Sequence, residues 1–367
     1  MNGPWAEVRR ILVMRLDNIG DVMMTSPVLR ALKENLPELS ITLMASPGGS
    51  KAAPLLPWVD EVLPWRVLWQ DLGRLSFDPA RERELIDIVA RGNYDAAIIL
   101  TSFKQTPHVA GYLCYLAGIP LRLGESKEWG GGVLTIEITP APDELHQAER
   151  NLRLIEHVGF RVEDRSLGVR VPEEVRSSAA ALLETRGVNP GSPYLLLSPW
   201  TSCQARTYGA ERFARATRRL SKETGWPVVV SGTEADRARS SELSGALANR
   251  GIDLVGTTGL PELAALVEGA QLVLTNNTST MHLADALRAP AVVLFSGTEL
   301  EGQWRPRDAP HRLLRRETWC SPCYAFTCPY NLECLDIPPE EVAEAALSLL
   351  TELGARFAAA PREGSPA

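Results

Sequence analysis

Short apolar segments alternate with longer helical patterns along most of the chain, and this alternation restricts the fold more than any other feature. Helical patterns stand, for example, at 80–91, 105–117 and 144–158. Short apolar strands that alternate with helices of ten or more residues form parallel sheets covered on both faces. The sequence therefore predicts an α/β fold. The apolar segments are 11–16, 41–45, 95–100, 133–138, 194–198, 227–231, 252–255, 271–275 and 291–295.

The length of the chain predicts two domains. Its 367 residues fit two domains of about 170–180 residues, each large enough for a core of its own. Two blocks of alternating strands and helices join near 169–175. We predict one Rossmann-like domain over 1–172, a second over 173–353, and a disordered tail over 354–367, where small and polar residues prevail.

Charge and the N-terminal stretch argue against several classes of protein. The chain has 38 Lys and Arg against 45 Asp and Glu, a formal net charge of -7. A nucleic-acid-binding domain would carry a concentrated basic surface instead. The opening MNGPWAEVRR lacks the apolar region of a secretory signal, and no run of about 18 apolar residues occurs. We expect a cytoplasmic protein without nucleic-acid partners, with peripheral contact to the inner membrane left open.

The stretch DNIGDVMMTSP places two carboxylates and a glycine where the first strand gives way to a helix. From Asp21 onward, apolar residues recur at helical spacing up to Pro37. An acid at a helix start commonly caps the helix, which contributes about 0.5–2 kcal/mol. The residues alone leave open whether Asp17 and Asp21 cap a helix or carry out chemistry.

Three loops in the second half follow predicted strands in the same way. They read SPWTSCQART (198–207), SGTEAD (231–236) and TNNTSTMHLADAL (275–287). In a doubly wound sheet, ligands bind beyond the carboxyl ends of the strands, and free N–H groups at helix starts hold phosphate well. These loops predict a phosphate-binding edge, although Thr278, Ser279 and Thr280 could each serve as an ordinary helix cap.

Four segments together resemble glycosyltransferase family 9, the ADP-heptose heptosyltransferases of bacterial surface-sugar assembly. They are RLDNIGDVMMTSPVLRALKENLP, HQAERNLRLIEHVG, SGTEAD and NNTSTMHLADALRAPAVVLFSGTELEGQWRP, in family order over about residues 9–350. The resemblance implies a GT-B fold, in which two doubly wound Rossmann-like domains face an inter-domain cleft. It also implies an inverting sugar transfer without a metal in the chemistry.

The resemblance also assigns roles to residues in each loop. Asp21 matches the base that takes the proton of the acceptor hydroxyl, Gly20 allows close approach of the acceptor, and Asp17 is a structural or orienting partner. Arg206 stands where the family often has Lys, and Asn277 stands where Asp is usual, so the donor is less well defined than the reaction class. The positions that match donor-binding residues are Thr201, Ser202, Arg206, Asp236 with Glu234 as its alternative, Asn277, Thr278, Ser279, Thr280, Met281 and His282.

The function that follows is transfer of a sugar, by resemblance heptose from ADP-heptose, onto a hydroxyl of a lipopolysaccharide core or another glycan. The domain over 1–172 would bind the acceptor and the domain over 173–353 the nucleotide sugar. A GT-B-type sugar-nucleotide epimerase or hydrolase, and a non-catalytic sugar-nucleotide-binding protein, are the alternatives. An NAD-dependent oxidoreductase is disfavoured because no G-x-G-x-x-G follows the first strand.

The six cysteines fall into two groups. Four thiols so close together can hold zinc or iron, and disulfides are uncommon in a cytosolic chain. Some protein heptosyltransferases related to the family hold iron through cysteines, with a different spacing. A structural zinc or iron, reduced buried thiols and disulfides all stay open, and none of them would be the catalytic centre. The grouped cysteines are Cys320, Cys323, Cys328 and Cys334, in CSPCYAFTCPYNLEC, and the isolated ones are Cys114 and Cys203.

Overall fold

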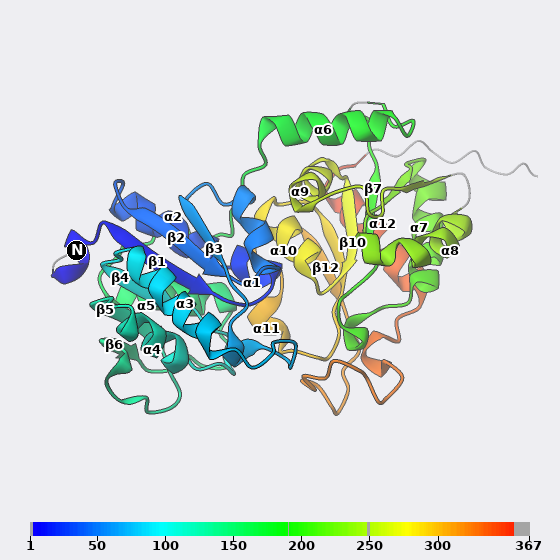
Figure 1. Cartoon of the computed structure of the whole chain (residues 1–367). Helices are drawn as coiled ribbons and strands as arrows, with labels where there is room; N and C mark the ends of the chain where they lie inside the picture. Colours follow the sequence, from blue (N-terminus) through cyan, green and yellow to red (C-terminus); the bar gives the residue numbers. More distant parts are fainter. Residues whose placement is uncertain (1–2, 190, 248–249, 356–367) are drawn as a thin grey trace, which may run out of the picture. The chain divides into compact units, whose positions relative to one another are not determined.

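The computed structural model describes residues 3–189, 191–247 and 250–355. The chain divides into two compact units, unit 1 (Met1–Arg170) and unit 2 (Val171–Ala367). Each unit is built on one parallel sheet covered by helices (Figure 1). Most of the predicted tail, residues 356–367, lies outside the described residues.

Unit 1 contains six parallel strands in the order β3-β2-β1-β4-β5-β6. The central strands β1 and β4 are buried almost throughout, as expected for a sheet covered on both faces, whereas the edge strand β3 is largely exposed. The strands are β1 (Arg10–Arg15), β2 (Ser40–Ala45), β3 (Glu61–Pro64), β4 (Ala96–Ile99), β5 (Leu121–Glu125) and β6 (Ile136–Ile138).

Helices pack on this sheet through side chains that alternate along each strand. Leu12 and Met14 of β1 belong to a core that also contains Leu85, Val89 and Cys114, from α3 and α4. Elsewhere in the unit, α5 contacts both α2 and β5. The helices are α1 (Ile19–Met23), α2 (Ser26–Asn35), α3 (Pro79–Arg91), α4 (His108–Leu116) and α5 (Gln147–His157), with short 3-10 turns η1 (Pro4–Glu7), η2 (Gly49–Leu55), η3 (Leu68–Gln70) and η4 (Gly131–Val133).

Unit 2 contains a second parallel sheet of six strands, in the order β12-β11-β10-β7-β8-β9. β7, β8, β10 and β11 are fully buried. The strands are β7 (Leu195–Ser198), β8 (Val228–Val230), β9 (Gly251–Asp253), β10 (Leu272–Asn276), β11 (Ala291–Leu294) and β12 (His311–Leu314).

Two groups of helices pack in unit 2. α7 contacts α8 and α12, while α9 contacts α6 and α10, and Figure 1 shows the two groups on opposite faces of the sheet. The helices are α6 (Glu173–Glu184), α7 (Ala210–Thr224), α8 (Arg237–Leu247), α9 (Leu260–Gly269), α10 (Ser279–Ala286), α11 (Glu301–Trp304) and α12 (Pro339–Glu352), with 3-10 turns η5 (Gln204–Arg206), η6 (Glu234–Asp236) and η8 (Glu333–Leu335).

Both sheets have the same strand order, because the first strand of each unit lies between the second and the fourth. β1 pairs with β2 and β4, and β7 pairs with β8 and β10. A doubly wound sheet reverses its winding between the first and fourth strands, and ligands bind at the carboxyl ends there. The loops after β1 and β4, and after β7 and β10, are therefore the expected binding positions.

The predicted α/β fold is confirmed, but several elements differ from the expectation. The helix expected from Asp21 onward is two helices, α1 and α2, with Pro27 in the first turn of α2. Proline is tolerated only in that first turn, where its missing N–H is not needed. The segment 133–138 forms a strand only over its last 3 residues. The strands β3, β5 and β12 were not predicted.

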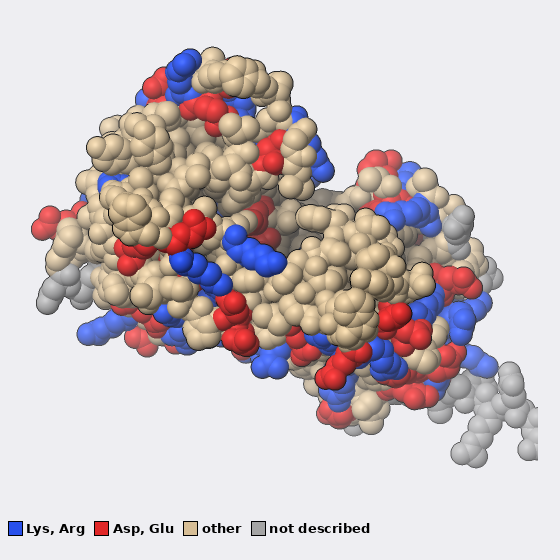
Figure 2. All heavy atoms as spheres, turned by 90° about the horizontal axis from the view of Figure 1, so that it is seen from below, with Lys and Arg blue, Asp and Glu red and all other residues tan. Residues whose placement is uncertain are grey.

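The surface of the described residues shows no concentration of basic charge on the face drawn in Figure 2. Lys and Arg alternate there with Asp and Glu. That face therefore lacks the basic surface that nucleic-acid-binding domains use. Within the described ranges, no helix combines the length and the apolar character needed to cross a membrane.

Candidate active site

The carboxyl end of β1 carries a buried arginine that holds both carboxylates of the first loop. The Arg15 side chain is 0% exposed, and its Nε lies 3.0 Å from Asp17 Oδ2. Its Nη2 lies 3.0 Å from Asp21 Oδ1 and donates to Ser102 Oγ at 2.7 Å. Because Ser102 follows β4, Arg15 joins the two loops at the point where the sheet reverses its winding.

Asp17 is bonded to the protein through both its side chain and its backbone. Its Oδ1 accepts from Gln105 Nε2 at 2.5 Å, and Ser46 Oγ donates to its backbone carbonyl at 2.6 Å. Burial raises the pKa of Asp17 above its usual range, Arg15 opposes this shift, and Asp21 adds to it. These contacts suit a structural or orienting role for Asp17.

Asp21 takes part in capping a helix and keeps positions at which each oxygen can accept a further hydrogen bond. It lies at the third position of α1, which begins at Ile19, with Gly20 buried in the same turn. Its Oδ2 accepts from the backbone N–H of Asn18 at 3.1 Å, and its Oδ1 faces Arg15. A carboxylate offers about four lone-pair positions, so each oxygen can accept a further hydrogen bond. The Asp21 side chain is 16% exposed, which leaves it within reach of a ligand.

α5, which carries the motif HQAERN, brings a second buried ion pair to this edge of the sheet. Arg150 Nη2 lies 2.5 Å from Glu125 Oε1, at the end of β5, and both side chains are 5% exposed. Gln147 Nε2 donates to the carbonyl of Thr101, in the loop after β4, at 3.0 Å. The motif therefore fixes α5 against the loop that carries Ser102.

In unit 2, Arg206 presents a cation in the loop after β7. Its Nε donates to Thr298 Oγ1 at 3.2 Å, and its Nη2 lies 2.5 Å from Glu299 Oε1. Both partners follow β11, and neither was predicted. Because 32% of the Arg206 side chain is exposed, an anionic ligand can reach it and compete with Glu299.

The start of α10 differs from a simple capped helix. Its N-cap residue Thr278 makes no side-chain capping bond. Asn277 is 3% exposed, and its Oδ1 accepts from the backbone N–H of Ser296 at 3.2 Å. Its Nδ2 is buried without a hydrogen-bond partner among the described residues. Leaving such a donor unpaired costs about 1–3 kcal/mol, so this helix start is suited to a ligand rich in acceptor oxygens.

Three of the predicted hydroxyl groups bond within the protein. Thr278 Oγ1 lies 3.2 Å from Thr275 Oγ1, on β10. Thr280 Oγ1 lies 3.0 Å from Ser198 Oγ, which links α10 to the end of β7. Thr201 Oγ1 donates to the carbonyl of Cys203 at 2.5 Å and lies 2.7 Å from Thr207 Oγ1. These hydroxyls fix the shape of the loops. Ser202 is exposed and Ser279 is half-buried.

The carboxylate of Asp236 forms its contacts with residues at the start of η6 and of α8. Its Oδ2 accepts from the backbone N–H of Thr233 at 2.9 Å and from Thr233 Oγ1 at 2.6 Å, and its Oδ1 pairs with Arg239. The alternative, Glu234, is exposed and pairs with Arg237.

A cavity of about 340 Å³, within the size range of small-ligand sites, lies beside this segment. It is lined by Trp200, Thr207, Ala210, Glu211, Arg239, Leu243 and Ala246.

The structure places the remaining predicted residues inside unit 2. Met281 is 1% exposed, and His282 lies on α10 with its ring 6.4 Å from that of Trp304.

Asn276 was not predicted from the sequence, although it adjoins Asn277. Its Oδ1 accepts from the N–H of Tyr208 at 3.0 Å and its Nδ2 donates to the carbonyl of Pro199 at 2.7 Å, so it ties the end of β10 to the loop after β7.

Comparison with known proteins identifies the family of the chain. The family model described as glycosyltransferase family 9 (heptosyltransferase) matches residues 83–333. The chain belongs to glycosyltransferase family 9. Lipopolysaccharide heptosyltransferase 2 of Salmonella typhimurium is 26% identical over 366 residues, which cover 94% of this chain and 99% of the relative.

Two solved structures support the GT-B fold of this family 9 member. The glycosyl transferase family 9 protein of Veillonella parvula superimposes with a TM-score of 0.77 at 23% identity, covering 96% of this chain and 99% of the other. The E. coli ADP-heptose lps heptosyltransferase II gives a TM-score of 0.74 at 22% identity, covering 94% and 99%. The predicted glycosyltransferase class and the GT-B fold are confirmed.

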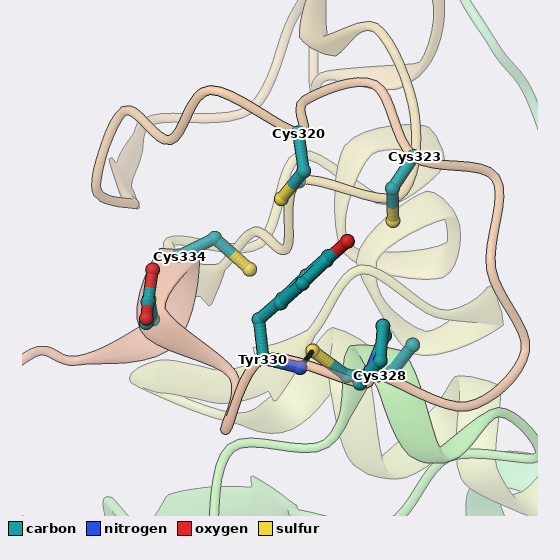
Figure 3. A pocket seen from close by; sticks show the side chains of 9 residues that line it. Cys320, Cys323, Cys328, Tyr330 and Cys334 are labelled. Atoms are coloured by element: carbon teal, nitrogen blue, oxygen red, sulfur yellow. Dashed lines mark hydrogen bonds between the residues drawn. The ribbon is translucent and has the colours of Figure 1, made fainter.

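The four grouped cysteines of this family 9 protein surround a cavity of about 20 Å³ in unit 2. Figure 3 shows the Tyr330 side chain extending between the four thiols. Cys328 Sγ accepts hydrogen bonds from the backbone N–H of Tyr330 at 3.3 Å and from that of Leu332 at 3.4 Å. No group of three or more His, Cys, Asp or Glu among the described residues is arranged to hold a metal. The predicted zinc or iron site at Cys320, Cys323, Cys328 and Cys334 is thus unsupported, and all six cysteines are free thiols.

The cysteine segment, residues 318–334, packs on the loops that hold Arg206. The N–H of Ala205 donates to the carbonyl of Phe326 at 3.0 Å, and the N–H of Cys328 donates to Gln204 Oε1 at 2.9 Å. The N–H of Tyr324 donates to the carbonyl of Thr298 at 2.9 Å. The segment therefore contacts the loops after β7 and β11 together.

We expect a thiol reagent at pH 8 to modify three cysteines rapidly in the folded protein and the other three only after unfolding. Cys320, Cys323 and Cys328 are half-buried. Burial raises the pKa of Cys334, and it raises the pKa of Cys114 to about 12, so few thiolates form there. Cys203, which is also buried, should react slowly as well.

Thiol titration before and after denaturation, with elemental analysis, checks this prediction. About one zinc or iron per chain together with protected thiols would reinstate the metal site.

Proposed function

We propose that the protein transfers heptose from ADP-heptose onto a hydroxyl of a lipopolysaccharide core or another glycan, with inversion at the anomeric carbon. The observation that carries the proposal is the Asp21 carboxylate, held at the carboxyl end of β1 by a buried arginine and still 16% exposed. Unit 1 would bind the acceptor and unit 2 the nucleotide sugar.

In the proposed reaction, Asp21 acts as general base. It accepts the proton of the acceptor hydroxyl while that oxygen forms a bond to the anomeric carbon. The bond between that carbon and the diphosphate breaks on the opposite side, and ADP leaves with the electron pair. Gly20 lies in the same turn of α1 and adds no side chain that an acceptor would have to avoid.

The leaving diphosphate requires stabilisation, which we assign to the loops of unit 2. Arg206 would exchange Glu299 for phosphate oxygens, and its planar fork can donate two hydrogen bonds at once. The N–H groups of Ser279 and Thr280, the first two residues of α10, would add partial positive charge, and the Nδ2 of Asn277 would find an acceptor.

The other predicted donor residues would act around this centre. Ser202 and Ser279 are accessible enough to contact the ligand, whereas Thr201 and Thr280 would fix the loops, and Met281 and His282 the start of α10. Asp236 would act through Arg239, which lines the cavity beside it.

The relatives support the choice of sugar and acceptor. Lipopolysaccharide heptosyltransferase 2 aligns over nearly its full length, and the name of the E. coli structure specifies ADP-heptose. The proposal places the enzyme in the cytoplasm, at the face of the inner membrane when its acceptor is a glycolipid.

Thermal unfolding with a panel of ADP-, GDP- and UDP-sugars tests the donor. A ligand at 100 times its Kd should stabilise the folded protein by about 2.7 kcal/mol. We expect ADP-heptose to raise the Tm most and ADP alone to raise it less. Equal shifts with the three nucleotides would remove the preference for adenine, and no shift with any of them would overturn the donor site.

A further inference from the structure

The guanidinium of Arg15 is enclosed at the carboxyl edge of the unit 1 sheet, with no exposed side-chain surface. Desolvation of a charge is expensive unless partners surround it. Arg15 has two carboxylate partners, Asp17 and Asp21, and donates to the hydroxyl of Ser102 as well. Such a group is held in one place and cannot follow a moving ligand.

The anchors of Arg15 come from two separate loops. Asp17 follows β1 and is itself held by Gln105, whose Oε1 accepts from the backbone N–H of Ser102 at 2.8 Å. Ser102 and Gln105 both follow β4. Arg15 therefore lies in a ring of contacts that closes across the switch point of the sheet.

Among the described residues, the Asp21 carboxylate has one contact on each of its oxygens. α1 has only 5 residues, and the backbone N–H of Asn18 contacts Oδ2 at 3.1 Å. The opposite oxygen, Oδ1, is held by Arg15 Nη2. With one contact on each oxygen, the carboxylate plane is fixed and one lone pair of each oxygen stays free.

We propose that Arg15 is a positioning residue for Asp21, fixing the carboxylate plane so that a free lone pair of Asp21 meets the acceptor hydroxyl. The inference rests on the proposed role of Asp21 as base. Arginine suits the task because its Nε and Nη2 each lie 3.0 Å from a different carboxylate and are held at a fixed separation in one plane, whereas a lysine ammonium is a single point charge. Misplacement of a catalytic group by about 1 Å can cost on the order of 100-fold in rate.

A double-mutant cycle between Arg15→Lys and Asp21→Asn tests the proposal. The assay measures ADP release from ADP-heptose with heptose-deficient lipopolysaccharide as the acceptor probe, and nucleotide affinity is measured separately. Arg15→Lys should lower kcat about 10- to 100-fold and leave the affinity for ADP unchanged. Adding Arg15→Lys to Asp21→Asn should cost no further activity, because a residue that acts through another has nothing left to position.

Two further variants keep the result interpretable. Arg122→Lys is the matched control, since Arg122 is also buried but donates to the carbonyls of Ile119 and Val133, and it should retain kcat. If Arg15→Lys fails to fold, Ser102→Ala, which removes one anchor of the guanidinium, should give a smaller loss that is again absent in the Asp21→Asn background. An unchanged kcat in Arg15→Lys, or losses that add in the double variant, would overturn the positioning role. A fully active Asp21→Asn would instead overturn the proposed base.

Discussion

Asp21→Asn should lower turnover by roughly 100- to 10,000-fold, the range expected when a general base is lost. The affinity for the nucleotide sugar should stay close to that of the unmodified protein, because Asp21 lies in unit 1 and the proposed phosphate-binding loops belong to unit 2. Asn keeps the size of the side chain and caps helices about as well as Asp, so the contact with the N–H of Asn18 should survive. Initial rates and nucleotide affinity, measured on the same preparation, separate the two effects.

Asp17→Asn is the control for this result. An amide at position 17 can still accept from Gln105 and face Arg15, so its loss of activity should be much smaller. If Asp17→Asn were inactive and Asp21→Asn active, the base would be Asp17. Two active variants would mean that the loop after β1 holds no base and that Asp21 serves only as a helix cap.

Arg206→Ala should weaken binding of ADP about 10- to 100-fold, because hydrogen bonds to a charged group contribute about 1.5–3 kcal/mol. Transfer should slow as well, since in the proposed reaction the same cation would face the charge that develops on the leaving diphosphate. Arg206→Lys should keep part of both properties, as a point charge would replace the fork. Calorimetric titration with ADP and steady-state rates measure the two effects.

Arg219→Ala provides a matched control in the same unit. Arg219 is 37% exposed, close to the 32% of Arg206, and it also pairs with a glutamate, Glu223, but on α7. Its removal should leave ADP binding and turnover unchanged. If Arg206→Ala behaved in the same way as Arg219→Ala, the phosphate site would have to lie elsewhere in the protein.

The sequence pattern predicts the central strands well because those strands are buried on both faces. In β1, β4, β7 and β10 three or four consecutive residues are apolar, which leaves a continuous signal. The strands that were missed carry weaker signals. β3 at Glu61–Pro64 is mostly exposed at an edge of the unit 1 sheet, and β12 at His311–Leu314 is half-buried at an edge of the unit 2 sheet. β5 contains both Arg122 and Gly124, which interrupt its apolar pattern.

Sequence patterns mark candidate site residues that lie within one loop, but they do not reveal contacts that join two loops. Asn277 follows β10 directly and Asp21 lies in the first turn of the helix after β1, so the strand-to-helix pattern marks both positions, while the family resemblance assigns their roles. Arg15 reads as an ordinary last residue of a strand, because its partner Ser102 is 87 positions away in the sequence. The contact between Arg206 and Glu299 has the same character, as it joins loops 93 positions apart. Such pairs are fixed by strand order, which no local pattern contains.

The cysteine segment is hydrogen-bonded to the loops after β7 and β11. A change in the length of one of these three stretches should therefore require a change in the others during evolution. A residue inserted near Phe326 would displace the backbone partner of Ala205, and with it the guanidinium of Arg206. Homologous chains that keep this segment should therefore keep the lengths of both loops constant. Chains that have lost the cysteine segment should show compensating changes in the loops beside Arg206. An alignment of the family would show these changes as gaps that occur together.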